Sequence, residues 1–531
     1  MTAPYRVFVA EPVSERGLEV LKQSGQIEVI EAKNVSAEKL TGVLAEMDGL
    51  IVRSATQVNA DFLKKTPKLK VIGRAGVGVD NVDVDAATER GMLVMNTPGG
   101  NTISTAEHAL SLLFSLARHI PQAHASMKAG KWDRKSFQGT ELYGKTLGII
   151  GMGRIGGEVA RRAIALGMRV KVFDPYMSLS RAKSLQVELC EKVEQLLPEA
   201  DFITLHSPLT PETKNILNAK TLTLCKKGVR IVNCARGGLV EEEALAEALK
   251  NGQVGGAALD VYEVEPPPGD WPLREIPNLI LSPHLGASTA EAQENVGVEI
   301  AEQITDFLLN GVVRNSVNLP SVDAKTMEVL RPYLLLGRKL GSLLSQVGPK
   351  RAEQLTIRYY GPITDYTVAP VTRAILEGFL KQAAGSEMNQ INVTKFAQTL
   401  GLKFNEIKAH EACDYAELVE VEARTGEEAV SVAATFFGQN PRLVRFNDGA
   451  IESGTDGVLF FMENKDRPGI VGWIGTLMGK YHVNIANMAL SRNKPGGRAL
   501  TILQLDSAPS EEALKEIRQE KDIYSVKLAQ L

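Results

Sequence analysis

The feature that most restricts the fold of this 531-residue chain is a regular alternation of short apolar runs with helix-like segments. It extends from about Arg6 to Asn315. Such alternation predicts βαβ units, and therefore parallel sheets covered by helices. The runs form two series, at residues 6–12, 27–32, 48–54, 69–76 and 93–98, and at residues 146–151, 169–174, 201–206, 228–235, 255–261 and 279–284. Two series predict two doubly wound α/β domains.

Two longer helical segments, residues 102–120 and 287–311, follow the first and the second series. The first is long enough to bridge two domains, and the second would lead the chain back to the first domain. We therefore predict a flavodoxin-like substrate domain made of residues 1–98 and 285–318, interrupted by a Rossmann-type cofactor domain at residues 99–284. A cleft between them would be crossed by two connections.

The rest of the chain follows other patterns. Residues 319–452 mix helical segments with alternating runs, which predicts an intervening α+β domain. Residues 455–531 follow the order β-α-β-β-α-β, which is that of a ferredoxin-like fold. At roughly 150 residues per domain, length alone predicts three or four domains, and these patterns indicate four.

The composition excludes several classes of function. Lys and Arg total 60 against 63 Asp and Glu, and no basic block stands out, so neither a nucleic-acid partner nor a membrane surface is expected. Four cysteines without a C-x-x-C pair predict neither a disulfide framework nor a metal site. Because the chain shows neither a long apolar stretch nor the pattern of a signal peptide, we expect a cytoplasmic protein.

A glycine-rich turn follows the first run of the second series. In G-M-G-R-I-G, Gly151, Gly153 and Gly156 fit the G-x-G-x-x-G pattern of dinucleotide-binding domains. The triplet alone is weak evidence, but a helix follows it, and Asp174 ends the next predicted strand. A carboxylate there accepts both hydroxyls of the adenosine ribose and repels a 2′-phosphate, which favours NAD over NADP.

Three polar residues, Arg236, Glu265 and His284, lie at the ends of successive predicted strands of the same domain. In an open α/β sheet this edge faces the ligand. The three suit oxidation of a 2-hydroxy acid: His284 would take the hydroxyl proton, Glu265 would orient the imidazole and raise its pKa, and Arg236 would hold substrate oxygens. His206, at the end of another strand, is a weaker alternative base.

The sequences around these residues resemble one family. VNCARGGLVEEEAL, ALDVYEVEPP and LSPHLGAST, with GMGRIGGEVA upstream, are similar to the D-isomer-specific 2-hydroxyacid dehydrogenases. Within that family, VIGRAGVGVDNVD, MNTPGGNT and KWDRKSFQGTEL resemble the members that oxidise 3-phosphoglycerate to 3-phosphohydroxypyruvate, the first step of L-serine biosynthesis. The tail NKDRPGIVG…VNIANMALSR resembles an ACT domain, a small regulatory module that binds amino acids.

The resemblance implies roles for individual residues. It makes Arg236, Glu265 and His284 catalytic, and it implies substrate-carboxylate binding by the backbone of Ala75, Gly76, Val77 and Gly78. Besides the glycine turn, it implies NAD contacts for Arg154, Ile155, Asp174, Ser207, Cys234, Ala235, Arg236, Asp260, His284 and Gly286.

The resemblance also implies regulation and assembly. Asn464, Asp466 and Asn484 match positions that bind the effector L-serine, which would act as a feedback inhibitor. Because ACT domains usually bind such ligands between two paired copies, a homo-oligomer, either a dimer or a tetramer, is expected.

A phosphorylated substrate requires cations. Arg53 and Arg74 end strands of the first series, and Arg134 lies in the W-D-R-K loop, which in the family reaches across a dimer interface. The alternative is that these arginines cap strands or pair with surface acids, and the chain would then be a glyoxylate or hydroxypyruvate reductase. A further alternative, of a different class, is a non-catalytic protein that senses NAD.

Overall fold

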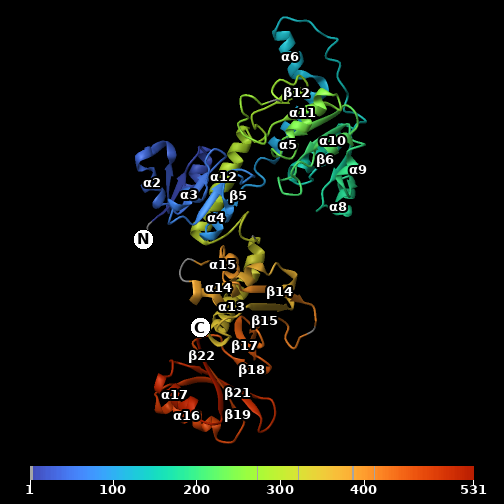
Figure 1. Ribbon diagram of the computed structural model, residues 1–531. Helices are drawn as coiled ribbons and strands as arrows, with labels where there is room; N and C mark the ends of the chain where they lie inside the picture. Colours follow the sequence, from blue (N-terminus) through green and yellow to red (C-terminus); the bar gives the residue numbers. More distant parts are fainter. Residues whose placement is uncertain (1–3, 272, 321, 385–387, 412) are drawn as a thin grey trace.

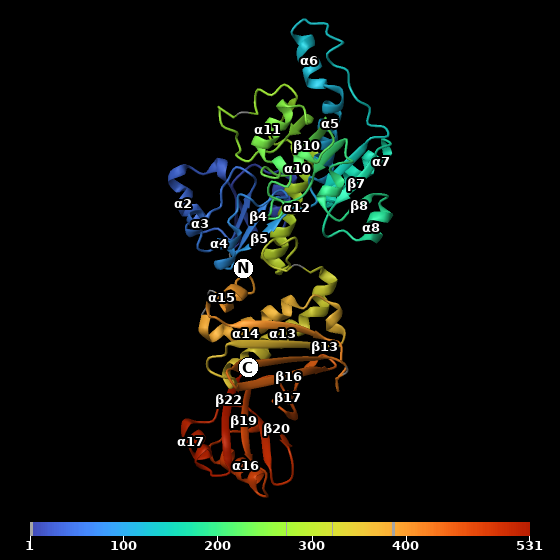
Figure 2. The same ribbon diagram turned by 45° about the vertical axis from the view of Figure 1, so that its right-hand side comes forward.

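The computed structural model describes residues 4–271, 273–320, 322–384, 388–411 and 413–531. Its strands form four sheets, of five, seven, six and four strands. The molecule is elongated, with the two α/β domains at one end and the two C-terminal sheets at the other (Figures 1 and 2). No helix in these described ranges is long and apolar enough to cross a membrane.

The first sheet is parallel and has the order β2-β1-β3-β4-β5, as in flavodoxin-like domains. Its strands are β1 (Tyr5–Val9), β2 (Ile27–Glu31), β3 (Gly49–Val52), β4 (Val71–Arg74) and β5 (Leu93–Asn96). Its short helices are α1 (Glu15–Gln23), α2 (Ala37–Ala45), α3 (Ala60–Lys64) and α4 (Val84–Glu89).

A helix from much later in the sequence completes this domain. The side chains of Val296, Ile300 and Ile304 on α12 (Ala290–Asn310) are buried in the core of the first sheet. Gly17 of α1 allows close packing, since a Cβ atom there would lie 2.6 Å from the carbonyl oxygen of Gly297. As expected from the sequence, α12 ends at Gly311, which adopts a left-handed conformation with φ 67°.

The second sheet is also parallel and has the Rossmann order β12-β11-β10-β9-β6-β7-β8, whose strand order reverses between β6 and β9. Its strands are β6 (Thr146–Ile150), β7 (Arg169–Phe173), β8 (Glu188–Cys190), β9 (Phe202–Leu205), β10 (Val229–Asn233), β11 (Val254–Leu259) and β12 (Leu279–Leu281). Its helices are α5 (Thr102–Arg118), α6 (Ile120–Lys128), α7 (Arg154–Ala165), α8 (Leu179–Ser184), α9 (Val193–Leu196), α10 (Ala219–Thr223) and α11 (Glu242–Lys250).

The predicted helix 102–120 differs from the observed one at its end. α5 stops at Arg118 because His119 takes a left-handed conformation with φ 52°, and α6, which the sequence pattern did not predict, begins directly after it. α6 and the following loop project away from the second sheet (Figure 1).

The third sheet is mixed and has the order β14-β13-β15-β16-β17-β18, with β13 and β14 parallel. Its strands are β13 (Gln354–Tyr360), β14 (Lys403–Ala409), β15 (Leu418–Thr425), β16 (Glu428–Phe437), β17 (Asn440–Phe446) and β18 (Gly449–Ser453). The helices of this part are α13 (Ala324–Val347), α14 (Ala369–Ala384) and α15 (Val393–Thr399).

The last sheet is antiparallel, with the order β20-β21-β19-β22 and the β-α-β-β-α-β connection predicted above. Its elements are β19 (Val458–Lys465), α16 (Ile470–Lys480), β20 (Ile485–Arg492), β21 (Arg498–Leu505), α17 (Glu511–Gln519) and β22 (Ile523–Gln530). Leu459, Phe461 and Ile502 join the hydrophobic core of the third sheet, so the two C-terminal sheets share one core. The predicted fold class is confirmed, and the exact domain boundaries stay predictions.

Candidate active site

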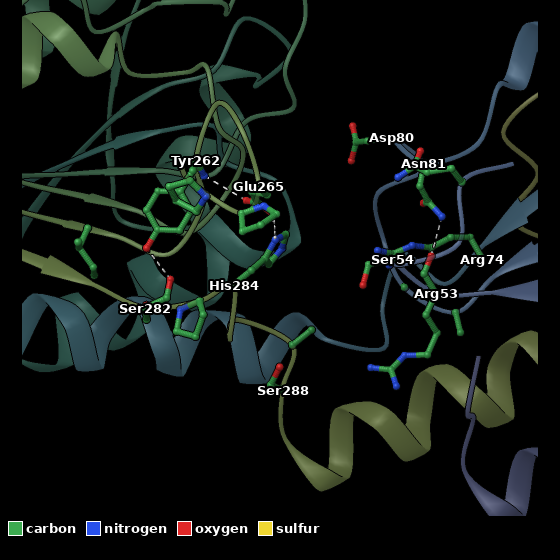
Figure 3. A pocket seen from close by; sticks show the side chains of 18 of the residues that line it. Arg53, Ser54, Arg74, Asp80, Asn81, Tyr262, Glu265, Ser282, His284 and Ser288 are labelled. Carbon is green, nitrogen blue, oxygen red and sulfur yellow. Dashed lines mark hydrogen bonds and ion pairs between the residues drawn. The ribbon is translucent and has the colours of Figure 1, made fainter. Parts of the chain in front are cut away.

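A cleft of about 760 Å³ lies between the two α/β domains. One wall is formed by residues at and after the ends of β3 and β4, including Arg53, Arg74 and Asp80. The other wall is formed by residues that follow β11 and β12, including Glu265 and His284, and the two groups face each other across the opening (Figure 3). Both walls are built from the carboxyl ends of parallel strands, where ligands of open α/β sheets bind.

His284 and Glu265 form an ion pair in this cleft. His284 Nδ1 lies 2.7 Å from Glu265 Oε2, and Glu265 Oε1 accepts a hydrogen bond of 3.1 Å from the backbone N–H of Tyr262. The hydrogen bond to Glu265 raises the pKa of His284 above its ordinary value, although burial opposes this. Because Glu265 binds Nδ1, the other ring nitrogen, Nε2, is left to exchange a proton with substrate.

Burial alone would raise the pKa of Glu265, but its hydrogen bonds to His284 and to the backbone of Tyr262 outweigh this and lower the pKa below its ordinary value. The carboxyl group is therefore ionised at neutral pH. It provides the negative charge that a protonated imidazole needs beside it.

A pH profile tests this pair. In the oxidation direction His284 must be neutral to accept a proton, so kcat/KM should rise with pH through a pKa above 6.5. Glu265→Gln removes the charge that raises this pKa. We therefore expect the rise to move to lower pH and the plateau to fall at least about tenfold. The matched control Glu263→Gln, an exposed neighbour, should leave the profile unchanged, whereas an unmoved profile in Glu265→Gln would contradict the pairing.

The backbone that carries His284 is strained and is held by Asp260. His284 has φ 55°, which is unusual for a residue other than glycine. The fully buried Asp260 carboxylate accepts hydrogen bonds from the backbone N–H groups of Leu285, at 2.7 Å, and Gly286, at 2.8 Å. It also accepts one of 2.7 Å from the Ser282 hydroxyl. Asp260 thus fixes the loop on which His284 stands.

Sequence reasoning missed the other residues of this network. His108 of α5 places its Nε2 3.2 Å from Asp260, and the Tyr262 hydroxyl donates to the carbonyl oxygen of Ser282 at 2.7 Å. The ligand atoms of His108, Cys234 and Asp260 lie within 4.8 Å of one another. Because the Asp260 oxygens already accept three hydrogen bonds, we assign this cluster to the hydrogen-bond network and not to a metal.

Arg236 reaches across the cleft from the loop after β10. Its Nε lies 3.1 Å from Oδ2 of Asp80, and its Nη1 donates to the carbonyl oxygen of Ala235 at 2.6 Å. A Cβ atom on Gly78 would lie only 2.0 Å from Nη2 of Arg236. The structure therefore brings Arg236 against the turn of residues 75–78, the predicted site of the substrate carboxylate.

The glycine turn has the geometry of a dinucleotide site. Gly151 has φ 94°, and a Cβ atom on Gly156 would lie 2.2 Å from the carbonyl oxygen of Gly151. Among the described residues, no atom beyond the neighbouring backbone lies within 4 Å of the Cβ position of Gly153, so the space above the start of α7 is open to a pyrophosphate. The N-cap residue is Gly153, which has no side chain to cap this helix end, so the first backbone N–H groups of α7 can bind a ligand.

Two further residues border the same turn. Asp174 accepts hydrogen bonds from the backbone N–H groups of Met152, at 2.7 Å, and Tyr176, at 2.9 Å, which fixes its carboxylate beside the turn. The Ser207 hydroxyl is buried and has no hydrogen-bond partner among the described residues. The residues present therefore fit NAD.

His206, the weaker alternative base, does not line the cleft. It is buried, its Nε2 lies 2.9 Å from the Thr204 hydroxyl, and burial lowers its pKa to about 4. A histidine that stays neutral and faces its own strand is poorly placed to take a substrate proton.

The predicted phosphate-binding arginines are divided between two places. Arg53 and Arg74 both line the cleft. Burial, together with the charge of Arg236, lowers the pKa of Arg74 to about 10, and its buried Nε has no hydrogen-bond partner among the described residues. Arg134 is exposed on the loop after α6 and does not line the cleft of this single chain.

The predicted effector residues are likewise not brought together within one chain. Asn464 and Asp466 lie at the end of β19, where Asn464 pairs with Ala499 of β21. Asn484 precedes β20, whose first residue pairs with Leu505 at the other end of β21. Six residues of extended strand separate these ends by about 20 Å.

Comparison with known proteins identifies the family. The model of the D-isomer specific 2-hydroxyacid dehydrogenase NAD binding domain matches residues 110–286, and that of the D-3-phosphoglycerate dehydrogenase intervening domain matches residues 329–447. A D-3-phosphoglycerate dehydrogenase of Bacillus subtilis is 43% identical over 530 residues, which cover 99% of this chain and 100% of that protein. The chain belongs to the D-3-phosphoglycerate dehydrogenase family. The family resemblance and the NAD cofactor predicted from the sequence are thereby confirmed.

Other comparisons separate this family from its neighbours. A D-3-phosphoglycerate dehydrogenase of Synechocystis is 42% identical, over 98% of this chain and 95% of that protein. The crystal structure of a glyoxylate reductase from Paecilomyes thermophila superposes with a TM-score of 0.54 at 30% sequence identity. The superposition covers 60% of this chain and 99% of that protein. D-3-phosphoglycerate dehydrogenases thus match nearly the whole chain, whereas the glyoxylate reductase matches only about three fifths of it.

Proposed function

We propose that this chain oxidises 3-phosphoglycerate to 3-phosphohydroxypyruvate with NAD, the first step of L-serine biosynthesis. The observation that carries the proposal is the pair of cleft arginines, Arg53 and Arg74, opposite the Glu265–His284 ion pair. The names of the full-length relatives agree with it.

In this proposal, separate groups of residues bind the substrate carboxylate, bind the phosphate and accept the proton. Arg236 and the backbone N–H groups of the turn 75–78 would hold the substrate carboxylate, and Arg53 and Arg74 would hold the phosphate. His284 would accept the proton of the 2-hydroxyl group at Nε2, and Glu265 would stabilise the imidazolium that forms. When bound, NAD supplies the acceptor for the hydride that leaves C2.

A substrate panel tests the proposal. The purified full chain should reduce NAD faster with 3-phosphoglycerate than with unphosphorylated D-glycerate or D-lactate. Because Asp174 would repel a 2′-phosphate, NADP should be the poorer cofactor. Faster turnover of glyoxylate or hydroxypyruvate with NADH than of the phosphorylated pair would favour the reductase alternative instead.

We also propose that residues 455–531 form an ACT domain that binds L-serine between two copies of the chain, and that serine inhibits the enzyme. Asn464 and Asp466 of one copy would meet Asn484 of the other, since within one copy they lie at opposite ends of the sheet. A dimer or tetramer follows from this arrangement. A cytoplasmic location is part of the proposal, supported by the free thiols of Cys190, Cys225, Cys234 and Cys413.

Asn484→Ala tests the regulatory part. The Asn484 side chain is exposed and donates one hydrogen bond of 2.8 Å to Asp506, so its loss should leave the fold intact. We expect the serine concentration for half-inhibition to rise about tenfold, the effect of losing a hydrogen bond to a charged ligand, with activity in the absence of serine unchanged. Asn405→Ala, at an exposed asparagine on β14, is the matched control. A wild type that binds no serine in a calorimetric titration would remove this part of the proposal.

A further inference from the structure

We propose that Asp80 is a positioning residue for the reaction, which holds the guanidinium of Arg236 from the opposite wall of the cleft. The juxtaposition is an ion pair between two domains: Asp80 follows β4 of the first sheet, and Arg236 follows β10 of the second. The inference rests on the proposed function, because it concerns the arginine that would hold the substrate carboxylate.

The turn that carries Asp80 is firmly anchored. The neighbouring Asn81 is buried, and its amide donates to the carbonyl oxygens of Arg53, at 2.8 Å, and Thr56, at 2.6 Å. The amide of Asn96 on β5 donates to the carbonyl oxygen of Val77 at 2.6 Å. These bonds join the turn to β3 and β5, so the position of the Asp80 backbone is set by the first sheet.

Each of the three nitrogens of the Arg236 guanidinium has a different neighbour. Nε is held by Asp80 and Nη1 by the carbonyl oxygen of Ala235, while Nη2 lies over Gly78. Asp80 therefore fixes the plane of the guanidinium and leaves one nitrogen directed at the turn where a carboxylate would bind. An arginine side chain has many rotamers, and anchoring it in advance lowers the entropy lost on binding.

Asp80 also balances charge in the cleft. Burial lowers the pKa of Arg74, and the charges of Arg236 and Arg53 add to this effect, whereas the carboxylates of Asp80 and Glu11 oppose it. Without Asp80, repulsion would favour conformations in which Arg236 turns away from Arg74. Substrate would then have to bring the two arginines together while binding.

An ordinary surface ion pair would have no such consequence. The Asp80 side chain is 73% exposed and that of Arg236 is 28% exposed, and exposed pairs contribute little to stability. The two interpretations therefore predict different results. A surface pair predicts no kinetic effect, and a positioning residue predicts a kinetic effect with little change in stability.

The experiment compares Asp80→Ala and Asp80→Asn with the control Asp83→Ala in the full chain. Asp83 lies on the same loop, but its carboxylate accepts the N–H of Ala86 at the start of α4. Asp80→Ala should lower kcat/KM for 3-phosphoglycerate by about 10- to 100-fold, as expected for a misplaced binding group. The dissociation constant of NAD should stay unchanged. Asp80→Asn, which keeps an acceptor for Nε–H, should recover part of the loss, and Asp83→Ala should keep wild-type kinetics.

A double-mutant cycle with Arg236→Lys decides whether Asp80 acts through Arg236. Lysine lacks the Nε group that Asp80 binds, so Asp80→Ala should cause less than about a twofold further loss in that background. Equal losses in both backgrounds, or unchanged kinetics in Asp80→Ala, would overturn the inference. Wild-type chain that fails to oxidise 3-phosphoglycerate would instead overturn the proposed function and remove the basis of this inference.

Discussion

Replacing His284 with alanine should lower kcat for NAD-dependent oxidation of 3-phosphoglycerate by about 10²- to 10⁴-fold, the usual contribution of a general base. The physical reason is that His284 is the imidazole in the cleft, with Nδ1 held by Glu265 and Nε2 left for the substrate. Binding of NAD should be retained, because the substitution leaves the glycine turn and Asp174, which would hold the pyrophosphate and the ribose, unchanged. Turnover is measured by NADH absorbance and NAD binding by fluorescence titration.

The control for this experiment is His410→Ala, at an exposed histidine that follows β14 of the third sheet and does not line the cleft, which should behave as wild type. Undiminished turnover in His284→Ala would remove His284 from the chemistry. Loss of NAD binding together with turnover would indicate that His284 mainly supports the structure of its loop. A wild type that binds NAD without turning over any 2-hydroxy acid would favour the NAD-sensing alternative.

Arg74→Ala should lower kcat/KM for 3-phosphoglycerate by about 30-fold or more, since removing one partner of a buried charge pair costs about 2–5 kcal/mol. Arg74 is largely buried but lines the cleft, and its buried Nε has no hydrogen-bond partner among the described residues, so an anion bound in the cleft would compensate its charge. Turnover of D-glycerate, which lacks the phosphate, should change much less. The measurement is kcat/KM for both substrates at one ionic strength.

Arg90→Ala is the matched control, because Arg90 is an exposed arginine at the end of α4 in the same domain. Arg74→Lys should restore only part of the activity, since an ammonium cannot form the two parallel hydrogen bonds of a guanidinium. An equal loss with D-glycerate and 3-phosphoglycerate would contradict phosphate binding. Such a result would indicate that Arg74 binds the substrate carboxylate, or that it only packs against the backbone of Gly76.

The elements of the fold could be predicted well where their signal is local. Apart from β8, each strand of the two parallel sheets overlaps one predicted run and begins no more than one residue before it, and Gly311 ends α12 as its sequence predicts. β8 was not predicted, because an edge strand of three residues is too short to show a periodic pattern of apolar residues. α6 escaped because the left-handed conformation of His119, which divides the helical segment, has no clear sequence signal.

The candidate site could be predicted only in part. Arg236, Glu265 and His284 were found because each follows a strand of one parallel sheet, and such ends meet at one edge. The pairing of Arg236 with Asp80 could not be found in this way, because the two residues belong to different sheets. The same holds for His108 and Asp260, which meet only because α5 packs on the second sheet.

By itself, the sequence determined the fold class, the family resemblance and the NAD cofactor. These depend on apolar periodicity, glycine spacing and one strand-end carboxylate, which are properties of neighbouring residues. Only the tertiary structure decided which side chains share the cleft, which arginines face it, and that Asn484 lies apart from Asn464 within one chain. The physical reason is that such contacts depend on how whole sheets and helices pack. The local sequence around two distant residues contains no pattern that indicates their contact.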